Sequence, residues 1–130
     1  MKKLIPILLT ALMLTGCTGA VNSTNNTYRQ ISMDEAGTMM ERESGYIILD
    51  VRRPDEYATG HIPNAINIPN ENIGTDEISQ LPNKDQLIMV YCRSGRRSKE
   101  AAEKLVKLGY TNIVEFGGIL DWKGETVSGE

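Results

Sequence analysis

The sequence predicts an α/β domain of three layers, in which helices flank a mainly parallel sheet. Two short and nearly continuous apolar runs, at residues 46–51 and 86–91, have the composition of strands buried on both faces. A longer segment at residues 98–108 spaces its apolar side chains at helical intervals. Strand and helix patterns alternate along the chain, as expected of parallel strands joined by crossover helices.

The N-terminal segment is predicted to be an export signal that does not enter the fold. Two lysines precede an apolar run that is too short for a membrane-spanning helix. The run ends at Leu14-Thr15-Gly16-Cys17, which resembles the lipobox of bacterial lipoproteins. The resemblance implies a signal peptide at 1–16 and a lipid on Cys17, although a plain exported protein stays an alternative. We expect a domain in the bacterial cell envelope, outside the cytoplasm, on the periplasmic or outer membrane face.

The rest of the chain is predicted to be a small polar tether followed by one domain. Residues 17–27 are small and polar, which is typical of a flexible linker, and the domain is expected at 28–130. The 130-residue chain has 14 basic and 17 acidic residues. Loss of the signal would remove two lysines and no acid, leaving 12 bases against 17 acids, a charge of −5. This acidity disfavours nucleic-acid binding, and we expect a monomer.

The first helix of the domain is marked by its ends. Ser32 and Glu35 have the spacing of a capping box, in which each side chain binds the other residue's backbone amide. This predicts a helix over 33–43 that ends near Gly45. The strand at 46–51 follows directly.

The middle of the domain contains shorter elements. A proline suited to a first helical turn opens a short helix at 54–57. A strand is expected at 65–69, where a second proline stops it, and a short helix is expected at 75–78.

The last third repeats the strand-helix-strand order. The strand at 86–91 is followed by a loop and by the helix at 98–108, which Gly109 terminates. A final strand is expected at 113–116.

Cys92 is the candidate nucleophile of the chain. It directly follows the strand at 86–91, and so it lies at the carboxyl end of the sheet, where α/β proteins bind ligands. If Cys17 carries a lipid, Cys92 has no disulfide partner within the chain. The loop beyond it contains three arginines and a glycine: Arg93, Gly95, Arg96 and Arg97. Loop amides, a helix N-terminus and guanidinium groups together favour an anionic sulfur or an anionic substrate.

These residues resemble those of the single-domain rhodaneses, or thiosulfate sulfurtransferases, over residues 28–124. The likeness is specific because several separate stretches share it, whereas the cysteine loop alone would be weaker evidence. The stretches are Leu49-Asp50-Val51-Arg52-Arg53-Pro54-Asp55-Glu56-Tyr57, Gly60-His61-Ile62-Pro63-Asn64-Ala65 continuing to Pro69, the Cys-x-x-Gly-x-Arg loop within Tyr91-Cys92-Arg93-Ser94-Gly95-Arg96-Arg97-Ser98, and Gly117-Gly118-Ile119-Leu120-Asp121-Trp122.

The resemblance implies a rhodanese-like fold and sulfur transfer through a persulfide on Cys92. The thiolate would take the outer sulfur of thiosulfate or a similar donor, and a thiol or cyanide would then accept it. Arg97, which matches the arginine of the motif, is expected to be foremost in attracting the donor. No metal or organic cofactor is required. The expected substrate-binding residues are Arg93, Ser94, Gly95, Arg96, Arg97 and Ser98.

Two other functions compete with this one. Phosphatases with a rhodanese-like fold use Cys-x5-Arg, which would need arginine at position 98, where this chain has Ser98. This count disfavours phosphatase chemistry. A noncatalytic or persulfide-carrier module that binds a partner protein stays open, because a sulfur carrier needs the same cysteine.

Five further residues are given structural roles. His61 is expected to form structural hydrogen bonds in a turn away from the loop, rather than to activate the cysteine. Asp50 and Arg52 are expected to tie the end of a central strand to neighbouring loops, and Glu56 is a candidate to join them. Trp122 is expected to pack near the C-terminal edge.

Overall fold

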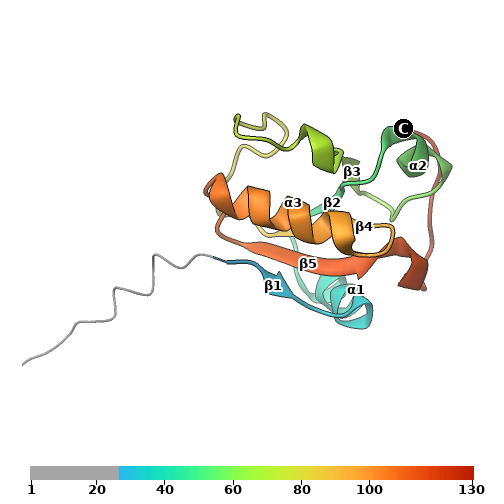
Figure 1. Ribbon diagram of the computed structural model, residues 1–130. Helices are drawn as coiled ribbons and strands as arrows, with labels where there is room; N and C mark the ends of the chain where they lie inside the picture. Colours follow the sequence, from blue (N-terminus) through green and yellow to red (C-terminus); the bar gives the residue numbers. More distant parts are fainter. Residues whose placement is uncertain (1–26) are drawn as a thin grey trace, which may run out of the picture.

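The computed structural model describes residues 27–130, and within this range helices cover both faces of a five-stranded sheet (Figure 1). The predicted signal peptide, Cys17 and the tether up to residue 26 lie outside the described residues. In chain order the elements are β1 (Arg29–Gln30), α1 (Met33–Arg42), β2 (Ile47–Asp50), α2 (Pro54–Thr59), β3 (Ile66–Asn67), the 3₁₀ turn η3 (Asn70–Asn72), β4 (Ile88–Cys92), α3 (Arg96–Lys107), β5 (Ile113–Gly118) and the 3₁₀ turn η4 (Ile119–Asp121).

The strand order is β1-β5-β4-β2-β3, and each neighbouring pair is parallel. This confirms the predicted fold class. The chain leaves the two central strands in opposite directions, because β2 is followed by β3 on one side and β4 by β5 on the other. In parallel sheets, ligands bind where the loops diverge in this way. Asp50 and Cys92 are the last residues of these two strands.

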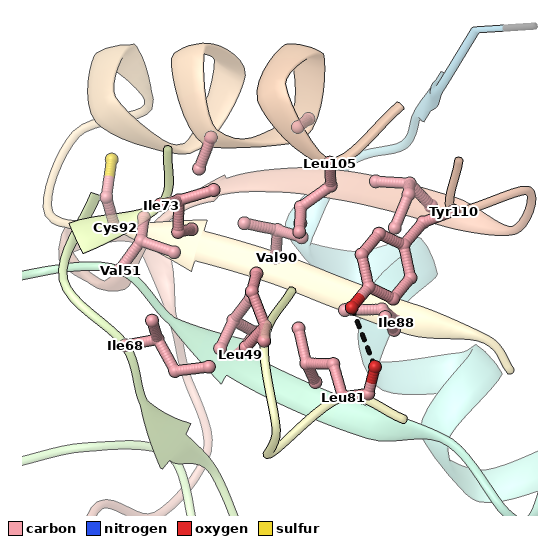
Figure 2. Close-up of a cluster of buried hydrophobic side chains, with 14 residues drawn as sticks. Leu49, Val51, Ile68, Ile73, Leu81, Ile88, Val90, Cys92, Leu105 and Tyr110 are labelled. Carbon is pink, nitrogen blue, oxygen red and sulfur yellow. Dashed lines mark hydrogen bonds between the residues drawn. The ribbon is translucent and has the colours of Figure 1, made fainter. Parts of the chain in front are cut away.

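Alternate side chains of the strands enter two separate cores. Met89 and Tyr91 of β4 pack on the side of α1, in a cluster that includes Ala36. Val90 and Cys92 point to the opposite face, where α3 packs, and Figure 2 shows the Cys92 sulfur on this side. The α3 side chains in this second core are Ala101, Ala102 and Leu105. The sheet is therefore apolar on both faces, which explains the nearly continuous apolar strands.

The predicted helix ends are confirmed at two places. Ser32 Oγ accepts a hydrogen bond from the Glu35 amide at 3.0 Å, and the Glu35 carboxylate accepts from the Ser32 amide at 2.9 Å. At the other end of the domain, Gly109 follows α3 with a φ of 101°. No helix between residues 27 and 130 has the length and apolar character needed to span a membrane.

The structure differs from the sequence prediction in four elements. The short helix predicted at 75–78 is wrong: the segment forms bends, because Ile73 and Ile78 are drawn into the core and four residues make too few helical hydrogen bonds. The strand β1 was not predicted, since its two residues are exposed and carry no apolar pattern. The helix α3 begins two residues earlier than expected, and β4 extends to include Cys92.

Candidate active site

Cys92 ends β4 between β2 and β5, and only 1% of its surface is exposed. Three residues of loop separate it from α3, so the amide groups of the first helical turn face the end of the strand. The Gly95 amide donates a hydrogen bond to Cys92 Sγ at 2.9 Å. This donor and the positive end of a twelve-residue helix both favour negative charge on the sulfur.

The loop lies directly on the end of β5, and glycine makes this approach possible. A Cβ atom at Gly118 would stand 2.0 Å from the Arg93 carbonyl oxygen and 2.5 Å from Ser94 Cα. The Leu120 amide donates to the same Arg93 carbonyl oxygen at 3.3 Å. The paired glycines noted in the sequence therefore allow the cysteine loop to pack directly against the end of β5.

Arg97 is held by a carboxylate from another helix. Its two terminal nitrogens donate to the Glu56 oxygens at 2.8 and 3.1 Å, which joins the first turn of α3 to α2. This hydrogen-bonded pairing with Arg97, helped by the Arg53 amide, lowers the pKa of Glu56 from 4.5 to about 2. Glu56 therefore pairs with Arg97, whereas Asp50 and Arg52 pair with each other.

An open concavity of about 420 Å³ lies over the loop, lined mainly by cationic side chains. Arg93 and Ser94 are exposed there, and Arg96 is exposed and pairs with Glu100 at 3.1 Å. The structure thus brings four of the six predicted substrate-binding residues to one surface. The lining residues are Arg53, Glu71, Arg93, Ser94, Arg96 and Arg97.

Ser98 and Gly95, the other two predicted residues, do not line this surface and are buried. The Ser98 hydroxyl lies 3.4 Å from Cys92 Sγ and donates to the Glu115 carboxylate at 2.5 Å. Glu115 was missed by the sequence reasoning. The signal that could have revealed it is a glutamate in the otherwise apolar strand Ile113–Phe116, on the same face as Ile113.

The other predicted structural roles are confirmed. Arg52 binds the Asp50 carboxylate and the Gly60 carbonyl oxygen, each at 2.7 Å, and so ties the end of β2 to a neighbouring turn. Tyr91 also donates to Asp50, and burial is the main cause that raises the pKa of this tyrosine. His61 stacks on the Tyr57 ring and bonds to the Tyr57 carbonyl group through Nδ1 at 2.9 Å.

Trp122 packs against the core on the α1 side, as expected, and its Nε1 donates to the Glu125 carbonyl oxygen at 2.9 Å.

Comparison with known proteins points to one family. The thiosulfate sulfurtransferase PspE of Escherichia coli (strain K12) is 38% identical over 73 residues, covering 56% of this chain and 70% of the relative. A Bacillus subtilis (strain 168) protein named as a candidate sulfur carrier, YrkF, is 32% identical over 98 residues. That match covers 75% of this chain and 52% of YrkF.

The solved structures agree. The crystal structure of a rhodanese-like domain protein from Staphylococcus aureus is 31% identical, with a TM-score of 0.68 over 78% of this chain and 99% of that one. Residues 32–125 match the family described as rhodanese-like domain. They include every element from α1 to η4, together with the cysteine loop and the glycines beneath it. The chain therefore belongs to the rhodanese-like domain family.

Proposed function

We propose that the protein is an extracytoplasmic sulfurtransferase that moves a sulfane sulfur from thiosulfate or a similar donor to a thiophilic acceptor. The observation that carries this proposal is the environment of Cys92 Sγ. The sulfur accepts a hydrogen bond from the Gly95 amide at the start of α3, and the arginines that follow it in the loop line an open concavity. Anionic sulfur and an anionic donor both suit this charge arrangement.

The first half of the reaction forms a persulfide. The Cys92 sulfur attacks the outer sulfur of thiosulfate, and its electron pair becomes the new S–S bond. The S–S bond of thiosulfate breaks, and its electron pair leaves with sulfite. The backbone amide of Gly95 stabilises the anionic sulfur, while Arg93 and Arg96 at the surface attract the donor.

The second half regenerates the cysteine. A thiol or cyanide attacks the outer sulfur of the persulfide, and the Cys92 sulfur leaves with the electron pair of the broken bond. The two half-reactions share one covalent intermediate, so the kinetics are ping-pong.

The loop dimensions favour sulfur over phosphate as the transferred group. The motif arginine stands five residues after the cysteine and is held by Glu56, and the next residue is the buried Ser98. A guanidinium engaged in two charged hydrogen bonds is less available to wrap a phosphate. Only 1% of the Cys92 surface is exposed, which suits attack by its sulfur on a single terminal sulfur atom of the donor.

The test of this function uses the purified chain, thiosulfate and cyanide. We expect the mass of the reduced protein to rise by one sulfur atom on Cys92, and thiocyanate to form over repeated turnovers. Cys92→Ser should do neither, while Lys123→Ala, at an exposed site that does not line the concavity, should behave as the wild type. A reduced wild-type chain that takes up no sulfur would overturn the proposal.

A persulfide carrier is the second candidate, favoured by the similarity to YrkF, which is named as a candidate sulfur carrier. A carrier would gain the sulfur on Cys92 and pass it to a protein thiol, yet turn over slowly with cyanide. Transfer of ³⁵S from the loaded chain to a reduced protein mixture, compared with its transfer to cyanide, distinguishes the two functions.

The location outside the cytoplasm is supported by the sequence of residues 1–17. We propose that Cys17 carries a lipid anchor and that the membrane is a partner through this lipid. Radiolabelled palmitate should enter the wild-type chain in a bacterial host and should not enter Cys17→Ser. Equal labelling of both chains, or of neither, would overturn the anchor and leave the sulfur chemistry untouched.

A further inference from the structure

Glu115 is a buried carboxyl group without a cationic partner. Only 2% of its surface is exposed, and no lysine, arginine or histidine within residues 27–130 forms an ion pair with it. Its hydrogen-bond donors are neutral: the Ser98 hydroxyl at 2.5 Å, the Gly117 amide at 2.9 Å and the Gln30 side chain at 3.3 Å. An apolar side chain would fill this face of β5 without the free-energy cost of removing a carboxyl group from water, as Ile113 does two residues earlier.

Ser98 connects this carboxyl group to the reactive cysteine. Its hydroxyl has one proton, and the nearest of its acceptors is Glu115 Oε2; the Gly95 carbonyl oxygen follows at 3.0 Å. With that proton on the side of Glu115, the serine oxygen presents its lone pairs to Cys92. The Cys92 thiol donates to this oxygen at 3.4 Å, within the range of hydrogen bonds that involve sulfur.

We propose that Glu115 holds the Cys92 proton during sulfur transfer and receives it through Ser98. This inference rests on the proposed function. As the Cys92 sulfur attacks the donor, its S–H bond breaks and the proton passes to the Ser98 oxygen, while the serine proton passes to Glu115. The step yields a persulfide, a neutral serine and a neutral carboxylic acid, and sulfite leaves with the electron pair of the broken S–S bond.

The second half-reaction returns the proton. When the acceptor removes the outer sulfur, Cys92 leaves as a thiolate, and Glu115 gives its proton back through Ser98. One proton is thus conserved within the protein over the whole cycle, and no buffer molecule needs to enter a nearly closed site. The exchange also avoids two neighbouring negative charges in the interior.

The other charged and titratable groups near this path cannot replace Glu115. Arg97 of α3 interacts with the Cys92 charge, but it is a cation bound to Glu56 and has no acceptor for a proton. Tyr28, next to β1, has a pKa raised by burial and then by Glu103 and Glu115, so it stays protonated at neutral pH.

The remaining charged groups near Cys92 lie at the end of β2, in the cysteine loop and at the start of α3. Asp50 of β2 is bound by Arg52 and Tyr91. Arg93 and Arg96 are exposed at the surface of the loop. Glu115 is therefore the acceptor to which Ser98 connects the sulfur.

The test measures the rate of persulfide formation on Cys92 against pH in three variants. In Glu115→Gln the amide keeps the shape of the side chain but cannot take the proton, and we expect a rate about 100-fold lower at pH 7. The loss should shrink as the pH rises, because hydroxide can then take the thiol proton in place of Glu115. Ser98→Ala keeps the carboxylate and breaks the path, so it should show the same pH-dependent loss. Glu103→Gln removes a neighbouring negative charge outside the path and should match the wild type.

The outcomes separate this inference from the function on which it rests. If the wild type forms no persulfide, the proposed function fails. If the wild type forms it and Glu115→Gln does so at the same rate at every pH, the sulfurtransferase stands and the proton path is wrong. If both variants misfold, the wild type alone still tests the proton path. Two protons that move together make the rate of persulfide formation fall along a curve as the fraction of D₂O in the solvent rises. A linear dependence, or none, would refute the path.

Discussion

Replacing Gly118 with alanine is expected to separate the cysteine loop from β5. The new methyl group would stand 2.0 Å from the Arg93 carbonyl oxygen, 2.3 Å from its carbon and 2.5 Å from Ser94 Cα. All three atoms belong to the backbone, and Cβ contacts below 3.0 Å essentially do not occur, so the loop or the strand must move. Gly118 has an ordinary extended φ of −131°, so the whole cost comes from the clash.

The magnitude follows from the nature of that clash. Overpacking a rigid site lowers the free energy of unfolding by about 1–3 kcal/mol as a rule. Because all three close contacts of Gly118→Ala are with backbone atoms, we expect a loss at the upper end, about 3 kcal/mol. A domain of this size loses roughly 4–8 °C of melting temperature per kcal/mol, so we expect a decrease of about 12–24 °C. Sulfur transfer should fall as well at temperatures where the variant is folded, because the displaced loop carries the Gly95 amide that binds Cys92 Sγ.

Two glycines act as controls in the same urea and thermal denaturation assay. Gly117 has a φ of 98° and open space around its Cβ position, so Gly117→Ala measures backbone strain alone, about 1–2 kcal/mol. Gly37 lies within α1 with no atom near its Cβ position, so Gly37→Ala should stabilise the protein by about 0.5–1 kcal/mol. A Gly118→Ala protein as stable as the wild type would refute the steric reasoning.

Three further contacts are tested by substitution. Because Arg97 holds the pKa of Glu56 down at about 2, the pair stabilises the fold above about pH 4.5 and this stabilisation is lost as the pH falls towards 2. At pH 7 the free energy of unfolding in urea should therefore be about 1–2 kcal/mol lower for Glu56→Gln than for the wild type. This difference should disappear near pH 2, and a difference that stays constant with pH would contradict the reasoning. Tyr91→Phe removes a buried donor to Asp50 and should lower the free energy of unfolding in urea by about 1–3 kcal/mol; unchanged stability would contradict this. Ser32→Ala should cost about 1 kcal/mol by removing the helix cap, and Ser32→Asp, which restores an acceptor, should recover most of it; no recovery would exclude a capping role.

The local features of the fold were predictable because they depend on neighbouring residues. The capping box at Ser32 lies within four residues of sequence, and the apolar run of β4 reflects burial on both faces. The thiol of Cys92 and the arginines beyond it belong to one short segment, so their proximity needed no knowledge of the fold. The helix at 75–78 was wrongly predicted from a pattern of only four residues, and burial of Ile78 outweighed the helical preference of this short segment.

Local sequence patterns predict the α/β class, the main helices and strands, and Cys92 with its arginine-rich loop, because helical and strand periodicity and a compact motif are properties of contiguous residues. The three-dimensional fold was needed to identify the partners that meet across the sheet. Arg97 meets Glu56 across 41 residues, and Ser98 meets Glu115 across 17. Gly118 became indispensable only where β5 passes beneath the loop. These contacts depend on strand order and register, which juxtapose residues that no local pattern connects.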